Sequence, residues 1–209
     1  MKLFKANKGI NLPGKKESTY KLATVDYLKP EYVYIPLSLK GTDFEQYVKP
    51  GDKVKLGEKI AERIRGQGLP AVKHATVSGE VIGTERKLHS SGFPYVSIKI
   101  KNDFKDTPIE LNPLKDIDAI DKTKLIELIG RAGIVGLGGA GFPTALKYQN
   151  VKNIDTVILN GAECEPFITA DYRIMIEDAD AVTDGLHILM KTVEAKKGII
   201  IIKEHKPDA

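Results

Sequence analysis

Residues 136–141 read G-L-G-G-A-G, a run with four glycines in six positions that fits the pattern G-x-G-x-x-G. Glycine has no Cβ, so the backbone N–H groups of such a loop can approach an anion closely. Pro143 is well placed at the first position of a helix, whose N-terminus also favours an anion. Lys147 follows within two turns and can reach a phosphate or the edge of a flavin ring. The run predicts a site for a phosphate-bearing ligand, and a chance glycine turn is the alternative.

The surroundings of the glycine run do not fit the dinucleotide-binding fingerprint. That fingerprint needs a strand directly before the glycines, a helix after them and an acidic residue about 20 positions further on. The acid is present, because Glu163 and Glu165 lie 22 and 24 residues beyond Gly141. The strand is missing, because a predicted helix ends near Gly133 and only two residues separate it from the run. We therefore expect a different phosphate-binding device.

A second group of polar side chains follows a predicted strand over residues 154–160. Asn160 stands at the carboxyl end of that strand, where open α/β sheets bind their ligands. Glu163 and Glu165 come next, on a loop. Two carboxylates and an amide suit hydrogen bonds to a ribose or to ring N–H groups, and no third ligand for a metal is near. The alternative is a solvated acidic loop. We expect Cys164, within this loop, to be a small buried residue rather than a nucleophile.

The second half of the chain has the pattern of an α/β layer. A helix is expected over residues 121–133, with an aspartate as its N-cap and a glycine as its stop. A buried strand is expected over residues 154–160, a fully apolar strand over residues 198–203, and one long helix over residues 171–195. This order of helices and strands predicts a parallel sheet. The chain stops after too few strands to close such a domain, so we expect it to be the N-terminal part of a longer protein.

The first half of the chain predicts a small all-β module over residues 31–101. Short β-branched strands alternate there with turns such as K-P-G-D, as in a β-sandwich or barrel. The order of its glycines and valines resembles the biotinyl and lipoyl barrel-sandwich domain, in which a lysine at a hairpin tip carries the prosthetic group. The corresponding stretch, residues 62–72, contains Arg63 and Arg65 but no lysine. A swinging-arm carrier is therefore disfavoured, and a structural or docking role is expected.

The expected fold class is thus an incomplete, Rossmann-like α/β layer that follows a small all-β barrel-sandwich module. An irregular, lysine-rich segment over residues 1–30 comes before the β module at 31–101. A linker with two prolines and many acids is expected over residues 102–120, and the α/β domain over residues 121–209.

The composition is that of an ordinary folded protein and excludes several classes. Of the 209 residues, 42% are hydrophobic and 29% are charged, which argues against disorder. The single cysteine rules out a disulfide framework and a cysteine-ligated iron–sulfur cluster within this chain. The four histidines have no metal-ligand spacing, so no metal site is predicted. No apolar run approaches the ~20 residues of a transmembrane helix, and no block of like charges indicates a nucleic-acid partner.

Positive charge is concentrated in the first half of the chain. Residues 1–112 contain 20 Lys and Arg against 13 Asp and Glu, whereas the remaining residues contain 12 against 15. A basic module joined to a mildly acidic one can face an acidic partner or an anionic membrane surface. An ordinary solvated surface is the alternative. The cytoplasm is the default location, because the N-terminus lacks the apolar core of a signal peptide.

Two long motifs together resemble a known family. GLGGAGFPTALKY followed by NGAECEPFITADYR is similar to the flavin-binding subunit of respiratory complex I. It resembles still more closely the C subunit of the Rnf-type ion-translocating electron transport complex. Leu137 stands where complex I has arginine and Ala162 where it has aspartate, and both departures favour Rnf; Tyr148 replaces a tryptophan. The resemblance spans nearly the whole chain, because the Rnf family also opens with a barrel-sandwich module.

The resemblance implies binding sites for FMN and NADH in the α/β domain. Family positions that line or hydrogen-bond FMN match Gly136, Gly138, Gly139, Lys147, Asn160 and Glu163. Family positions that contact the nicotinamide nucleotide match Phe142, by stacking, and Glu165, by hydrogen bonding. No residue of this chain is assigned a catalytic role of its own, because the redox chemistry belongs to the flavin.

The function implied by the resemblance is that of an NADH-dependent oxidoreductase subunit. It would pass electrons between NAD(H), FMN and iron–sulfur clusters or ferredoxin, as a peripheral subunit on the cytoplasmic face of the membrane, together with the other subunits of an ion-translocating complex. The two cysteine motifs of the family are absent here, so [4Fe–4S] clusters are expected only in a further C-terminal part. The 209 residues alone are expected to bind FMN weakly and to be inactive. The rival hypothesis is a non-redox module that binds a phosphate ligand and docks a protein.

Overall fold

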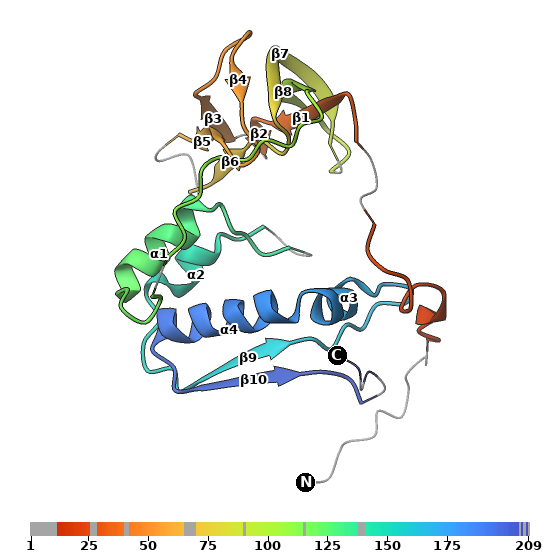
Figure 1. Ribbon diagram of the computed structural model, residues 1–209, viewed down its shortest axis with the longest axis vertical. Coiled ribbons are helices and arrows are strands. Elements are labelled where there is room, and N and C mark those ends of the chain that lie inside the picture. The colour runs from red at the N-terminus through yellow and green to blue at the C-terminus, as the bar shows by residue number, and fades with distance from the viewer. Residues whose placement is uncertain are drawn as a thin grey trace. The chain divides into compact units, whose positions relative to one another are not determined.

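The chain folds into two compact units, which we call the central and the terminal unit. The central unit comprises Asp26–Asn153, and the terminal unit combines Met1–Val25 with Ile154–Ala209. Each has its own secondary structure (Figure 1). The computed structural model describes residues 12–25, 29–39, 42–64, 70–89, 91–114, 116–137, 141–204, 206 and 208. The predicted domain boundaries after residues 30, 101 and 120 stay a prediction.

Short strands of the central unit form two antiparallel sheets. One sheet has the order β1-β8-β7-β4, and the other has the order β2-β3-β5-β6 (Figure 1). The strands are β1 (Tyr32–Pro36), β2 (Ser38–Leu39), β3 (Thr42–Gln46), β4 (Lys53–Val54), β5 (Lys59–Arg63), β6 (Val72–His74), β7 (Gly79–Leu88) and β8 (Pro94–Asn102). This part of the chain is therefore all-β, as predicted. Within the stretch at residues 62–72, where a carrier domain would hold its lysine, residues 65–69 lie outside the described residues.

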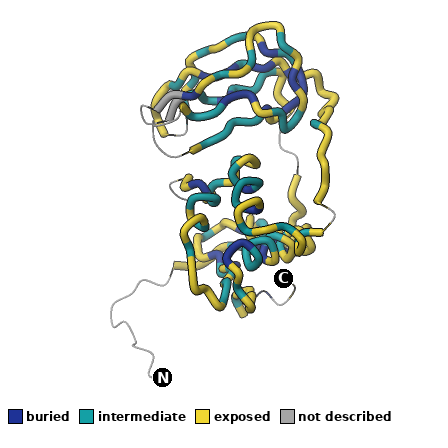
Figure 2. The backbone as a smooth tube through the Cα atoms, turned by 90° about the vertical axis from the view of Figure 1, so that its left-hand side faces the viewer, coloured by how far each residue is buried: buried dark blue, intermediate teal, exposed yellow. Residues whose placement is uncertain are grey.

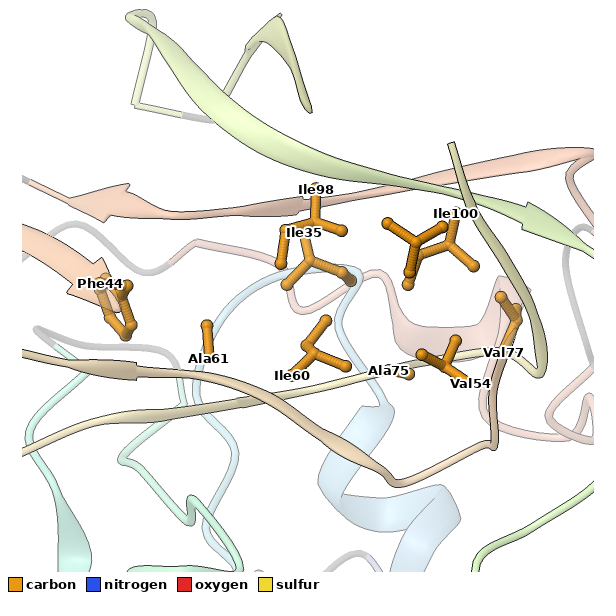
Figure 3. Close-up of a cluster of buried hydrophobic side chains, with 10 residues drawn as sticks. Ile35, Phe44, Val54, Ile60, Ala61, Ala75, Val77, Ile98 and Ile100 are labelled. Atoms are coloured by element: carbon orange, nitrogen blue, oxygen red, sulfur yellow. The ribbon is translucent and has the colours of Figure 1, made fainter. Parts of the chain in front are cut away.

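The core of the β module lies between the two sheets. Ile98 and Ile100 of β8 are fully buried, and Ile35 of β1 pairs with Ile98 across the sheet. Successive side chains of a strand point to opposite faces, so burial of one face also specifies the strand register. Each fully buried side chain of this size stabilises the fold by ~1.5–3 kcal/mol. Figure 2 shows buried positions among more exposed ones in the β module, and in β7 they alternate at the start of the strand. The core also contains Phe44, Val54, Ile60, Ala61, Ala75, Val77 and Val81 (Figure 3).

The expected linker is in part attached to the β module. The N–H of Leu56 donates to the carbonyl oxygen of Thr107 at 2.9 Å, and the carbonyl oxygen of Leu56 accepts from the N–H of Ile109 at 2.9 Å. These two hydrogen bonds flank a parallel bridge between Leu56 and Pro108. Residues 107–109 therefore have a fixed position beside the β module. The prolines and acidic residues of this segment do not predict that position.

The first helix of the central unit, α1 (Lys122–Arg131), begins and ends as the sequence predicts. Asp121 is its N-cap, and one carboxylate oxygen of Asp121 accepts the N–H of Lys124 at 3.0 Å. Beyond the last turn, Gly133 has a φ of 68°, a left-handed conformation that glycine adopts without steric cost. A short helix, α2 (Thr144–Gln149), follows the glycine run.

The terminal unit contains the predicted α/β layer. Strands β9 (Thr156–Asn160) and β10 (Lys197–Ile201) pair in parallel, which confirms the parallel sheet. Two helices connect them, and the second lies along the sheet (Figure 1). The N-terminal part of this unit includes a short 3-10 helix, η1 (Lys16–Ser18).

The single long helix predicted over residues 171–195 is wrong. The structure has two helices, α3 (Ala170–Glu177) and α4 (Ala179–Val193), and Asp178 between them has a φ of −141° and a ψ of 46°. Aspartate is a poor former of helix interiors and is favoured at helix starts, so this acidic stretch ends one helix and opens the next. No helix among the described residues combines the length and apolarity that a bilayer span requires.

The prediction that the strand over residues 154–160 is buried is also wrong. No residue of β9 or β10 is buried, and Ile158 is 57% exposed. Helix α4 packs on the sheet, since a Cβ added at Gly198 would lie 2.6 Å from Sδ of Met190. Ile158 and Ile201 remain exposed, so the described residues of the terminal unit cover the sheet only in part. The apolar residue types alone do not show how far the faces of a sheet are covered.

We expect Gly185→Ala to stabilise the terminal unit. Gly185 lies inside α4, its backbone is not in the left-handed region, and an added Cβ would meet nothing within 4 Å. Alanine is better than glycine in a helix interior by ~0.5–1 kcal/mol. Chemical denaturation of the wild-type and variant proteins should show this gain. A loss of stability would mean that α4 does not continue through residue 185 in solution.

Candidate functional site

The described residues on either side of the glycine run, 135–137 and 141–143, lie side by side in the central unit, and we call them the glycine hairpin. Val135 pairs with Pro143 in an antiparallel bridge, and the N–H of Gly136 donates to the carbonyl oxygen of Phe142 at 2.9 Å. The N–H of Gly136 is therefore used within the fold. Its α-carbon remains open, because an added Cβ would find its nearest neighbour, the carbonyl oxygen of Phe142, at 3.9 Å.

The described residues of the glycine hairpin next to residues 138–140 are open and partly apolar. Gly141 has a φ of 68°, and an added Cβ there would meet nothing within 4 Å. Leu137 is 93% exposed and Phe142 is 47% exposed, so the ring of Phe142 is accessible for stacking. Gly138 and Gly139, two of the residues assigned to FMN by resemblance, lie outside the described residues.

Helix α2 starts one residue later than predicted. Pro143 is its N-cap, with an extended ψ of 123°, because the backbone of Pro143 is held in the bridge to Val135. Lys147 lies on α2 with an exposed side chain, and its Nζ is 5.5 Å from the centroid of the Tyr148 ring. Val135 belongs to an isolated bridge rather than to a strand, which confirms that the glycine run lacks the context of the dinucleotide fingerprint.

In the terminal unit, the acidic loop leaves β9 through a tight turn. Asn160 ends the strand, and its side-chain Oδ1 accepts the N–H of Ala162 at 3.0 Å. The N–H of Gly161 donates to the carbonyl oxygen of Ile201 at 2.8 Å. A Cβ at Gly161 would lie 2.8 Å from Sδ of Met175 and 3.2 Å from the carbonyl oxygen of Ile201, so a side chain there would displace the side chain of Met175. The turn sets the direction in which the following carboxylates leave the sheet.

Glu163, one of the predicted FMN-binding residues, is buried in a network of hydrogen bonds. Its side chain is 2% exposed. One carboxylate oxygen accepts the N–H of Asp171 at 2.9 Å, in the first turn of α3, where the side chain of Thr169 makes no capping bond. The other accepts from Lys206 Nζ at 3.1 Å and from Lys16 Nζ at 3.3 Å. Burial raises the pKa of the Glu163 carboxyl, but these hydrogen bonds outweigh burial and hold the pKa below its usual range.

The two residues that follow Glu163 face the solvent. Cys164 is exposed, and its Sγ donates to the carbonyl oxygen of Ala162 at 2.9 Å, so the prediction of a buried cysteine is wrong. The reason is that Glu163 occupies the inward position of the loop and Cys164 turns outward. Glu165 is exposed as well, which leaves its carboxylate accessible to a ligand.

The structure brings the described site residues together in two groups. The group in the central unit consists of Gly136, Phe142 and Lys147. The group in the terminal unit consists of Asn160, Glu163 and Glu165. Their union in a single nucleotide site stays a prediction. Sequence reasoning missed Lys16 and Lys206, the cationic partners of Glu163. No local pattern identifies them, since Lys16 and Glu163 are 147 residues apart.

Comparison with known protein families assigns both halves of the chain. Residues 4–105 match the family model of the RnfC barrel sandwich hybrid domain. Residues 129–209 match that of the Nuo51 FMN-binding domain. The chain therefore combines an all-β barrel-sandwich domain with a domain of the FMN-binding class.

Curated relatives define the family more closely. The chain is 41% identical over 205 residues to the C subunit of the Na(+)-translocating ferredoxin:NAD(+) oxidoreductase complex of Acetobacterium woodii, a match that covers 96% of this chain and 46% of that protein. It is 39% identical over 222 residues to the C subunit of the ion-translocating oxidoreductase complex of Pectobacterium carotovorum, which covers 100% of this chain and 29% of that protein. The chain belongs to the family of C subunits of Rnf-type complexes. It spans less than half the length of these relatives.

Proposed function

We propose that this chain forms the FMN- and nicotinamide-binding part of a subunit that passes electrons between NAD(H) and other redox centres. One observation carries the proposal: residues matched by the FMN-binding family contain both an open glycine hairpin and an acidic loop at the carboxyl end of a parallel strand. Bound FMN would supply the hydride and one-electron chemistry. The residues of the chain bind and orient the two nucleotides.

The glycine hairpin fits the phosphate end of FMN. The α-carbons of Gly136 and Gly141 face open space, so the backbone there can approach a phosphate closely. We assign Gly138 and Gly139 to the same phosphate by family resemblance. The exposed ammonium of Lys147, on the helix that follows, adds a positive charge that can pair with phosphate or with the ring edge.

The acidic loop fits the flavin ring and its electron donor. We assign Glu163 to the flavin by family resemblance alone, because its carboxylate is 2% exposed and already accepts three hydrogen bonds within the fold. Asn160 lies beside it at the end of β9. We assign Phe142 to stacking on the nicotinamide nucleotide and the exposed Glu165 to hydrogen bonding with it. Strands β9 and β10 with helices α3 and α4 would then begin a Rossmann-like layer.

The names of the relatives support a role within a membrane-bound complex. We propose that the chain belongs to a peripheral subunit on the cytoplasmic face of the membrane, with the other subunits, NADH and ferredoxin as partners. The Acetobacterium relative is named as part of a ferredoxin:NAD(+) oxidoreductase complex. Iron–sulfur clusters need several cysteine ligands, and this chain has one cysteine. Any [4Fe–4S] cluster would therefore be held by residues other than these.

An absorbance titration tests the proposal against the non-redox alternative. The protein, at the length that its gene encodes, is titrated with FMN, ADP and inorganic phosphate. We expect saturable binding of FMN, weak binding of ADP and no displacement of FMN by millimolar phosphate. Equal affinity for all three would support a general phosphate-binding module instead. We also expect the 209 residues alone to lose FMN during gel filtration, and retention of stoichiometric flavin would contradict that expectation.

We expect Glu165→Gln to weaken NADH binding selectively. Glutamine keeps one acceptor oxygen but removes the charge of the exposed Glu165 carboxylate. A hydrogen bond that loses its charged partner is weaker by ~0.5–1.5 kcal/mol, so the Kd for NADH should rise about 3- to 10-fold. Isothermal calorimetry should show an unchanged Kd for FMN. Glu204→Gln, which alters another exposed carboxylate of the terminal unit, is the matched control. An equal effect of both variants would remove Glu165 from the site.

A further inference from the structure

The N-terminal segment of residues 14–24, which we call the strap, is attached to the acidic loop of the terminal unit. The N–H of Phe167 donates to the carbonyl oxygen of Gly14 at 2.8 Å, and Thr19 Oγ1 donates to the carbonyl oxygen of Phe167 at 3.1 Å. The ammonium of Lys16 also donates to the carbonyl oxygen of Ile168. These contacts hold the loop where Phe167 has a φ of 67°, a conformation that a non-glycine residue adopts only with support.

A second set of contacts fixes the strap to α3. The N–H of Thr24 donates to Oε1 of Glu177 at 2.8 Å, and Nη1 of Arg173 donates to the carbonyl oxygen of Tyr20 at 3.3 Å. Hydrogen bonds from Thr24 and Arg173 lower the pKa of Glu177 from 4.5 to about 2, so this anchor stays ionised at neutral pH. The Tyr20 and Tyr172 rings lie 6.2 Å apart. The strap is therefore held at both of its ends.

Lys16, near the start of the strap, takes part in a buried ion-pair network with Glu163 and Lys206. The side chains of Lys16, Lys206 and Glu163 are 13%, 5% and 2% exposed. Two ammonium groups share one carboxylate, and Lys206 also lies over the Tyr172 ring, with Nζ 5.1 Å from the centroid. A buried charge that loses its partner is strongly destabilising, so Glu163 cannot leave this position without cost. The carboxylate is thereby fixed two residues before the exposed Glu165.

We propose that Lys16 and Lys206 are positioning residues, which hold Glu163 so that the loop presents Glu165 and Asn160 in the geometry that binds the nucleotides. This inference rests on the proposed function of the loop. The strap makes the loop rigid before the ligand arrives, and a rigid site loses less conformational entropy on binding. Neither lysine touches the nucleotide, and both act through Glu163.

Lys16→Met is the sharpest test, because it leaves Glu163 and Lys206 as a balanced pair and so preserves folding. We expect amide exchange at Phe167, whose N–H donates to the carbonyl oxygen of Gly14 in the strap, to become about tenfold faster, since contacts that hold the strap on the loop are lost. We expect the Kd for NADH to rise about 3- to 10-fold because the loop must be ordered on binding. Lys15→Met, on the neighbouring exposed side chain, should change neither quantity. Lys16→Arg should restore both in large part.

A double-mutant cycle separates positioning from general stability. If Lys16 acts through the loop, Lys16→Met should weaken NADH binding much less in the Glu165→Gln background than in the wild type. Equal effects in both backgrounds, or unchanged exchange at Phe167, would overturn the proposal. The exchange experiment needs no ligand. If the wild-type protein binds neither nucleotide, the proposed function fails, and faster exchange in Lys16→Met alone still establishes that the strap orders this loop.

Discussion

Gly136→Ala is expected to weaken FMN binding about 10- to 100-fold while the protein keeps its fold. The structure has room for the new methyl group within the chain, because its nearest neighbour would be the carbonyl oxygen of Phe142 at 3.9 Å. In the proposed FMN site, the same methyl group would occupy the space through which the phosphate approaches the hairpin. Extra methyl groups in a tightly packed site cost ~1–3 kcal/mol, and ~1.4 kcal/mol is a tenfold change in Kd. Fluorescence titration with FMN, alongside thermal denaturation, measures both quantities.

Gly141→Ala provides the contrast. It places a methyl group in open space but at a φ of 68°, where alanine is strained. We expect this variant to lose ~1 kcal/mol of stability locally, which Gly136→Ala should not. If Gly136→Ala retained full FMN affinity, the glycine hairpin would not be the phosphate site. The FMN assignment would then have to move to other residues of the matched domain.

Gly79→Ala is expected to be the most destabilising single methyl addition in the β module. A Cβ at Gly79 would lie 1.9 Å from the carbonyl oxygen of Lys101 and 2.9 Å from its carbonyl carbon. These are backbone atoms of the adjacent strand, where Gly79 pairs with Asn102, and they cannot rotate away as a side chain can. We expect a loss of more than ~3 kcal/mol, above the usual range for overpacking. Urea denaturation and amide exchange along β8 should show it.

The Gly185→Ala variant is a matched control for this experiment. It makes the same chemical change in α4, with no atom within 4 Å of the new methyl group, and is expected to act in the opposite direction. Both effects are measured by the same denaturation experiment. A nearly neutral Gly79→Ala would show that β7 and β8 are further apart in solution than the structure has them.

The sequence by itself determined much of the local structure. Asp121 identified the start of α1, and short β-branched strands separated by turns identified the all-β module. These signals work because capping bonds and turns depend on residues within a few positions of each other. The two long motifs also identified the family, since their residue types and separation are specific. Whether their residues bind FMN and NADH as expected stays a prediction.

Only the tertiary structure decided which of these residues are accessible. Glu163 and Glu165 look equivalent in the sequence, yet one is buried between two lysines and the other is exposed. In the same way, the apolar residues of β9 do not reveal that none of them is buried. Burial and ion pairing depend on which segments meet in space. A contact such as that between Lys16 and Glu163, across 147 residues, has no local signature from which it can be predicted.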